Sequence, residues 1–242
     1  MSRHPHRPRY ATWCRVLAIA LMGLSAAPAW AQVSGQIAVT SDYRWRGVSL
    51  TDGGPALQSS LSYDHSSGLF AGLFASNVEL RPGDGGLGVQ AFGGYARRWR
   101  DDSAWDVGVV GYVYPRTDQG TTYNYLEAFA GATVDQFGVR LYISDSYYGS
   151  GNRSAYIEGS YTVPLTGWLA LGVHVGVLQQ WTTGSSRYAR VDETRVDGRI
   201  GVTAEAAGFT FELSVVAAQT QDCPGGPALC EPGVVATVSR GF

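Results

Sequence analysis

A strict alternation of apolar and polar residues begins at Val33 and sets the strongest restriction on the fold. In the segment VSGQIAVTSDYRWR, residues 33–46, every second residue from Val33 to Trp45 forms an apolar face, and all charged residues lie on the other face. A period of two predicts an extended strand with one apolar and one polar side. The segment is long for a strand of a soluble protein, but it suits a tilted strand that crosses a bilayer. It therefore predicts lipid outside and water inside.

The same alternation recurs along the rest of the chain and is interrupted by Gly-rich, polar loops. The segments that carry it are residues 55–63, 69–77, 87–96, 105–113, 123–133, 137–143, 155–163, 169–177, 196–204, 209–217 and 234–242. With the first segment they predict about twelve strands, joined by links that alternate between long and short. An even strand number with alternating links is typical of bacterial outer-membrane barrels. We therefore expect a transmembrane antiparallel up-and-down β-barrel, an all-β fold.

Aromatic residues on the apolar faces give a second, independent indication of a membrane. One set falls where this topology places the periplasmic ends of the strands, as expected of an aromatic girdle. Its members are Tyr63, Tyr95, Trp105, Phe137, Tyr161, Phe209 and Phe242. Tyr43 and Trp45 are expected in the outer girdle.

A soluble β-sandwich or a lipocalin-like barrel is the main alternative fold, because it also alternates, with the apolar side turned inward. Composition weighs against it. Only 16% of the residues are charged, and no Lys is present among the 242 residues, whereas soluble domains carry about 25% charged residues. The sequence has no apolar run of 18 or more residues, which excludes a membrane-spanning helix. The membrane barrel is the interpretation that fits all of these features.

The N-terminal residues 1–31 resemble a secretory signal peptide. Four Arg precede or flank a short apolar core, Val16–Leu24, and Ala29-Trp30-Ala31 has the small-x-small form of a cleavage site. The sequence thus predicts a signal peptide over 1–31 and a barrel over 32–242. Removing four of the 18 basic residues leaves 14 against 20 acidic ones, a formal charge of −6. That balance speaks against nucleic acid as a partner.

Two cysteines remain after this cleavage, Cys223 and Cys230, within the turn-rich segment DCPGGPALCEPG. An exported protein is expected to oxidise such a pair, so a disulfide is favoured over free thiols or a metal pair.

Several charged residues are expected to face the lumen, since charges on the lipid side cost several kcal/mol near the midplane. They form either Arg–carboxylate pairs that fill a narrow lumen or a polar pore lining that sets solute preference. The candidates for the lining are Asp42, Arg44, Arg46, Asp106, Glu127, Arg140, Glu158 and Arg199.

Asp42, Arg44 and Arg46 are the sharpest candidates, because two-residue spacing would stack them on one face of the first strand. The two Arg are then expected to attract small anions or carboxylates near the outer mouth. Asp145 and Glu158 are suggested as their partners across the lumen.

The last segment, VVATVSRGF, ends in an aromatic residue, Phe242, which resembles the assembly signal of outer-membrane barrels. Further segments resemble the TorF family of outer-membrane porins. They are residues 39–80, TYNYLEAFAG at 122–131, DSYYGSGNRSAYIEGSYTVPL at 145–165, and VSRGF at the end. This resemblance implies a channel in a bacterial outer membrane, in contact with outer-membrane lipid and inserted by the barrel assembly machinery. The paired cysteines are not part of the expected family pattern.

The predicted function is passive diffusion of small hydrophilic solutes. A narrow or plugged barrel, structural or with external loops that bind a partner, is the rival hypothesis. An outer-membrane hydrolase is less favoured. After cleavage only His65 and His174 remain as candidate bases, and no G-x-S-x-G motif is present. Neither a metal site nor a cofactor is predicted.

Overall fold

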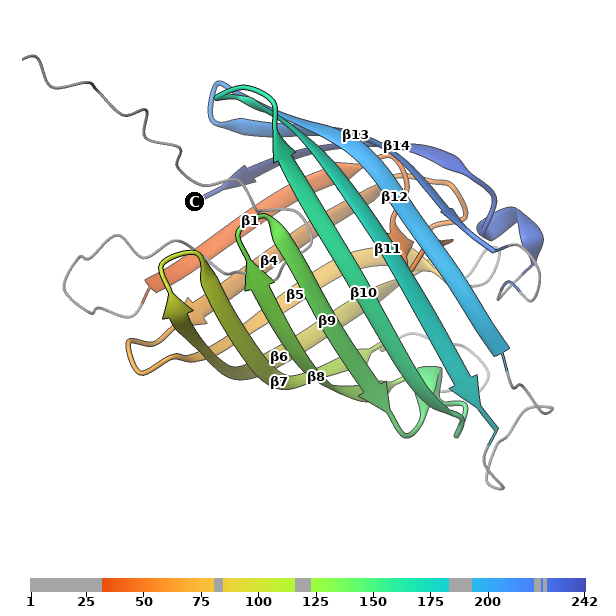
Figure 1. Ribbon diagram of the computed structural model, residues 1–242. Coiled ribbons are helices and arrows are strands. Elements are labelled where there is room, and N and C mark those ends of the chain that lie inside the picture. Colours follow the sequence, from red (N-terminus) through yellow and green to blue (C-terminus); the bar gives the residue numbers. More distant parts are fainter. Residues whose placement is uncertain (1–31, 81–84, 116–122, 183–192, 220–222, 224–225) are drawn as a thin grey trace, which may run out of the picture.

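The computed structural model describes residues 32–80, 85–115, 123–182, 193–219, 223 and 226–242. The predicted signal peptide, 1–31, lies outside the described residues. Within them, twelve antiparallel strands form a closed barrel (Figure 1). The barrel strands are β1 (Gln32–Thr40), β4 (Ala56–Asp64), β5 (Leu69–Glu79), β6 (Gly85–Arg100), β7 (Ser103–Val113), β8 (Tyr125–Val134), β9 (Phe137–Ser144), β10 (Arg153–Pro164), β11 (Leu169–Trp181), β12 (Glu193–Ala206), β13 (Phe209–Ala218) and β14 (Gly233–Gly241).

Each strand pairs with its neighbours in the chain, and β1 closes the barrel against β14. The pairs of this seam run from Gln36–Gly241 to Thr40–Thr237. Beyond them, the backbone N–H of Phe242 donates to Gly35 O at 3.0 Å, and Gly35 N–H donates to Phe242 O at 2.9 Å. The predicted up-and-down barrel is therefore confirmed.

Short turns join the strands at one end of the barrel, and longer links join them at the other. The short-turn end carries the C-terminus (Figure 1). The long-loop end carries the 3-10 helices η2 (Tyr147–Gly149) and η3 (Pro227–Leu229) and a separate two-stranded sheet, β2 (Arg44–Trp45) and β3 (Val48–Ser49). No helix in the described part of the chain is long and apolar enough to cross a membrane.

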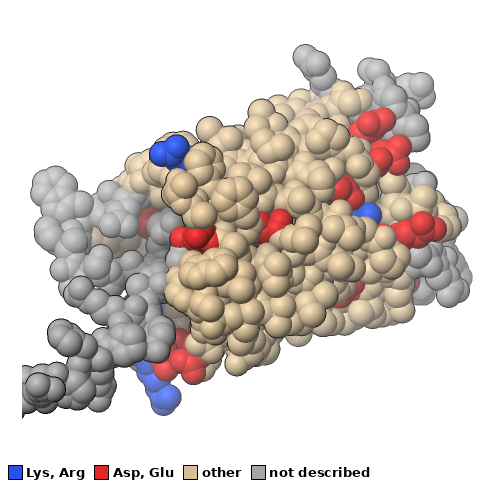
Figure 2. Space-filling model, turned by 90° about the horizontal axis from the view of Figure 1, so that it is seen from above, with Lys and Arg blue, Asp and Glu red and all other residues tan. Residues whose placement is uncertain are grey.

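The outer surface of the barrel is apolar. On β1, Val33, Ile37 and Val39 are more than half exposed, whereas Ala38 and Thr40 on the opposite face are buried. The same alternation runs through the other strands, with Leu, Val and Ile outward. Uncharged side chains cover most of the barrel wall on the face shown in Figure 2. A continuous apolar wall is the surface that hydrocarbon solvates, and it is expensive to expose to water.

The sequence overestimated the first strand. β1 ends at Thr40 rather than Arg46, because the alternation continues in sequence while the chain leaves the wall and turns into the lumen. The predicted outer-girdle position of Tyr43 and Trp45 is therefore wrong. Both rings lie in the lumen, Tyr43 at 5.8 Å from Phe74 and Trp45 at 5.5 Å from Tyr112, measured between ring centroids.

Candidate functional site: a divided lumen

A β-hairpin from the link between β1 and β4 occupies the long-loop half of the lumen. Arg44 and Trp45 pair with Ser49 and Val48, leaving Arg46 and Gly47 as a two-residue turn. Both turn residues have positive φ, 49° and 78°, as a type I′ turn requires. A Cβ on Gly47 would lie 2.6 Å from Ala218 Cβ. Only glycine thus permits this approach of the turn to β13.

Arg46, at the hairpin tip, forms a buried ion pair with Glu127 on β8. Its two terminal nitrogens donate to the two carboxylate oxygens at 3.0 and 2.7 Å. The exposed fractions of the two side chains are 3% and 0%. The Tyr112 hydroxyl donates to the same carboxylate at 3.0 Å. This bidentate, charge-assisted pairing fixes both partners.

Aromatic rings surround the Arg46 guanidinium. The Tyr156 ring lies closest, with its centroid 4.1 Å from Arg46 Cζ. Trp45, Tyr142 and Tyr147 follow at 5.2, 5.2 and 5.4 Å. Cation–π contacts of desolvated arginines contribute about 2 kcal/mol. The hairpin tip is therefore held by both charge and ring contacts.

Burial alone would lower the pKa of Arg46. The Glu127 carboxylate, followed by the neighbouring tyrosines, outweighs burial and raises the pKa of Arg46 well above its usual range. The guanidinium therefore stays charged.

Arg44 points the other way, toward β13 and the last loop. Its Nε donates to Asp42 Oδ2 at 2.6 Å, and its Nη1 donates to the backbone oxygen of Glu231 at 2.7 Å. Asp42 also accepts from Ser49 Oγ at 2.6 Å. The predicted stack of Asp42, Arg44 and Arg46 on one strand face is wrong, since the turn at Arg46 separates the two arginines.

The suggested partners of these arginines are also wrong. Glu127, not Glu158, pairs with Arg46. Asp145 instead pairs with Arg153 at 3.5 Å on the exposed surface. Its side chain is 96% exposed and lies outside the lumen.

An aromatic core fills the remaining space around the hairpin. It consists of inward side chains of the wall, of the hairpin link and of the β9–β10 link. Its buried members are Leu50, Val78, Phe92, Val110, Tyr112, Tyr114, Tyr125, Phe129, Tyr142, Tyr147, Tyr156 and Leu178. Tyr112 and Tyr125 stack with centroids 4.2 Å apart. The sequence predicts a lumen filled or lined by charged residues, and this aromatic core was not predicted. The signal was present in the aromatic residues that share the inward faces of β7–β10 with the charges.

The short-turn half of the lumen is hollow. A cavity of about 160 Å³ lies along β8–β13 and extends to the turns that join them. Small inward residues leave this space free, among them Gly138, Gly172 and Gly201. By the volume that one water needs, the cavity holds roughly ten water molecules. We call it the vestibule.

Charged residues form the layer between the aromatic core and the vestibule. Arg140 donates to both Asp106 oxygens at 2.7 Å, and Arg199 pairs with Glu212. Glu158 accepts a long hydrogen bond, 3.4 Å, from the Tyr142 hydroxyl.

A second polar group in this layer centres on Asp197. The Asp197 carboxylate accepts from the Tyr156 hydroxyl at 3.1 Å and lies 3.2 Å from His174 Nε2. The pore-lining residues predicted from the sequence, Asp106, Glu127, Arg140, Glu158 and Arg199, all face the lumen. Their role in setting solute preference stays a prediction.

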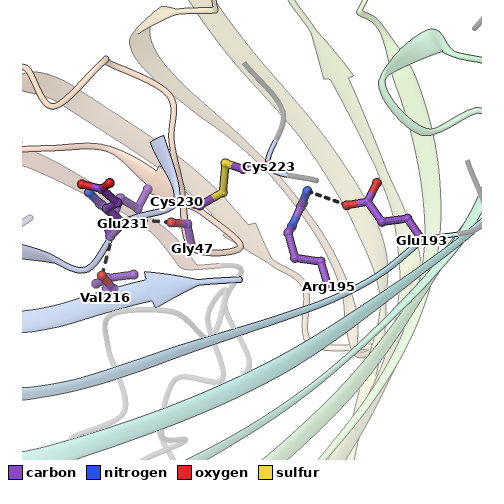
Figure 3. Close-up of a disulfide and its surroundings, with 8 residues drawn as sticks. Gly47, Glu193, Arg195, Val216, Cys223, Cys230 and Glu231 are labelled. Carbon is purple, nitrogen blue, oxygen red and sulfur yellow. Dashed lines mark hydrogen bonds and ion pairs between the residues drawn. A yellow bond between two sulfur atoms is a disulfide. The ribbon is translucent and has the colours of Figure 1, made fainter. Parts of the chain in front are cut away.

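Cys223 and Cys230 form the predicted disulfide (Figure 3). It closes the loop that presents the Glu231 carbonyl to Arg44. Phe242 projects from the barrel end, with 76% of its surface exposed. Its ring covers Gly35, where a Cβ would lie 2.5 Å from the ring. No cluster of three or more potential metal ligands occurs among the described residues.

This architecture is that of a porin-like barrel, and comparison with solved structures agrees. The structure titled "NanC porin structure in rhombohedral crystal form" matches with a TM-score of 0.54 at 11% identity, over 86% of this chain and 98% of that one. "KdgM porin" matches at 0.53 and 8% identity, with the same coverage. A KdgM complex with disordered oligogalacturonate matches at 0.52 and 7% identity, over 88% and 98%. At such identities the likeness shows the fold.

The chain belongs to the family described as "Bacterial protein of unknown function (Gcw_chp)", which it matches over residues 25–242. No curated protein matches it. The narrower resemblance to the TorF family stays a prediction.

Proposed function

We propose that the protein is a narrow outer-membrane channel for small hydrophilic solutes, with the hairpin of residues 41–55 as its internal constriction. The observation that carries this proposal is the vestibule, a cavity with charged residues in its lining, inside a closed barrel with an apolar outer wall. Its arginines and carboxylates offer hydrogen bonds in place of bulk water, as pore linings do. A solute that crosses the barrel in either direction has to pass both the vestibule and the hairpin.

A second candidate is a barrel that the hairpin keeps closed, which then serves a structural role or binds a partner through its loops. The buried Arg46–Glu127 pair and its surrounding rings favour it. Displacing the hairpin would leave Glu127 without its partner in a buried site, which costs several kcal/mol. Passage of solutes therefore requires motion of the hairpin or a narrow path beside it.

Planar-bilayer conductance of the refolded barrel separates these functions. The comparison uses the unaltered protein and a variant in which residues 42–51 are replaced by a short Gly-Ser linker, since β1 and β4 are adjacent strands. Steps from both proteins, larger in the variant, support the constricted channel. Steps from the variant alone support the closed barrel. If neither protein gives current steps, although heat-modifiable gel migration shows that both are folded, the barrel has a structural role.

Export and assembly form part of this proposal. Residues 1–31 act as a cleaved signal peptide, and Phe242 contributes to recognition by the outer-membrane assembly machinery. Mass spectrometry of the protein purified from bacterial outer membranes tests the first point, with Gln32 expected as the N-terminal residue. A full-length mass would contradict cleavage. That the protein is not an enzyme stays a prediction.

A further inference from the structure

We propose that the vestibule binds a small organic cation, with the Glu158 carboxylate as the group that receives it. The inference rests on the proposed function, because it names the class of solute that the cavity favours. Most charged residues of the charged layer already form ion pairs with one another.

Each arginine near the vestibule is matched by a carboxylate. Arg46 pairs with Glu127, Arg140 with Asp106, and Arg199 with Glu212. Their charges are therefore neutralised within the wall. An anion entering the cavity would have to displace one of these carboxylates.

Among the described residues, Asp197 and Glu158 are two further carboxylates of this layer, while Glu205 lines the vestibule nearer the turns. Of Asp197 and Glu158, only Asp197 has a basic neighbour in contact. Asp197 lies against His174 and the Tyr156 hydroxyl. Glu158 forms no ion pair within the described residues, and the Tyr142 hydroxyl, 3.4 Å away, is its hydrogen-bond partner. Among the described residues, the layer thus holds more carboxylates than arginines, and Glu158 is a member of this acidic excess that faces the cavity.

The position of Glu158 makes this charge available to a solute. It lies on β10 directly opposite Arg140 in the strand pairing, and Arg140 gives its donors to Asp106 instead. Glu158, Arg140 and His174 all line the vestibule. A carboxylate beside a partly enclosed cavity gains from a cation that replaces water there.

The size of the cavity limits the cation. A volume of about 160 Å³ admits a molecule of several heavy atoms rather than an oligomer. Apolar lining residues, including Ala170 and Gly172, suit a short alkyl chain behind the charged group. A primary ammonium on a chain of a few carbons fits both requirements.

Three probes of similar size and different charge test the proposal: butylammonium, butyrate and 1-butanol. Saturation-transfer NMR is recorded with the refolded full-length barrel in detergent micelles. We expect transfer to butylammonium above that to the other two, and loss of this excess in Glu158→Gln. Asp101→Asn removes a carboxylate from the exposed β6–β7 turn and is expected to keep the excess. Equal saturation transfer to all three probes would overturn the proposal. This outcome is measured on the unaltered protein and does not depend on the folding of a variant.

Reversal potentials in a salt gradient separate this proposal from the channel function. We expect cation preference in the unaltered protein and a drop of about fivefold in the cation-to-anion permeability ratio in Glu158→Gln, the effect of one charge about 4 Å away in water. If the protein conducts but shows neither cation preference nor butylammonium binding, the cation site is refuted and the channel function is retained. Butylammonium binding without current keeps the site and refutes the channel.

Discussion

The two halves of the lumen are enclosed by the same strands but differ in what the strands place inside. On β8 the inward residues run from Tyr125 through Glu127 and Phe129 to Gly131 and Thr133. The inward faces of β9 and β10 likewise carry a ring and then a charge toward the long loops, and small residues toward the short turns. Large side chains thus fill the long-loop half, small ones leave the vestibule open, and charged groups mark the border. Side-chain size along each strand, rather than strand number, decides where a barrel of this width is hollow.

The largest expected effect comes from breaking the filled half at Arg46. Arg46→Ala leaves the Glu127 carboxylate buried without its partner, so we expect a loss of about 3–5 kcal/mol in the free energy of unfolding. The measurement is urea unfolding of the barrel in lipid vesicles, followed by tryptophan fluorescence. Arg100→Ala, at the exposed end of β6, is the matched control, with an expected change below about 0.5 kcal/mol.

A double-mutant cycle sharpens the same test. We expect Arg46→Met with Glu127→Leu to be less destabilising than either single change, because no buried charge is left unpaired. Additive losses would show that the ion pair is not the contact that holds the hairpin.

The disulfide should stabilise the filled half from outside. Replacing both cysteines by serine frees the loop whose Glu231 carbonyl accepts from Arg44. For a disulfide that closes a loop of this length, we expect its removal to lower the free energy of unfolding by about 2–3 kcal/mol. We also expect more frequent current fluctuations, as the Arg44 end of the hairpin loosens. Single-channel recording with and without reductant checks this, and the double-serine variant should be insensitive to reductant.

Gly47 offers a finer test of how closely the hairpin packs. Gly47 and Gly53 both have positive φ, 78° and 73°, but a Cβ at Gly53 would meet no atom within 4 Å. Gly53→Ala therefore measures backbone strain alone, about 1 kcal/mol. Gly47→Ala adds overlap with Ala218, and we expect about 1–2 kcal/mol more. Equal losses in the two variants would mean that the hairpin shifts freely in the lumen.

The wall of the barrel could be predicted from the sequence because lipid imposes a period of two on every strand. The contents of the lumen were less predictable. Position 46 shows why: alternation alone places Arg46 on a strand, whereas the positive φ at Arg46 and Gly47 turns the chain inward. That choice depends on Ala218 and Glu127, more than 80 residues away in sequence. The charged candidates could be assigned to the inside, but their pairing depends on register across several strands.

Mutations in the hollow half should alter ion selectivity and leave the free energy of unfolding nearly unchanged. Glu158 has no ion pair with any residue that the structure describes, so Glu158→Gln should change the free energy of unfolding by less than about 0.5 kcal/mol. The same urea titration that shows the large loss in Arg46→Ala measures it. A loss of several kcal/mol would mean that Glu158 is a structural partner in the charged layer, and the vestibule would then carry no spare charge. A negligible loss together with altered ion selectivity would separate the two halves by role, one holding the barrel together and the other selecting what enters it.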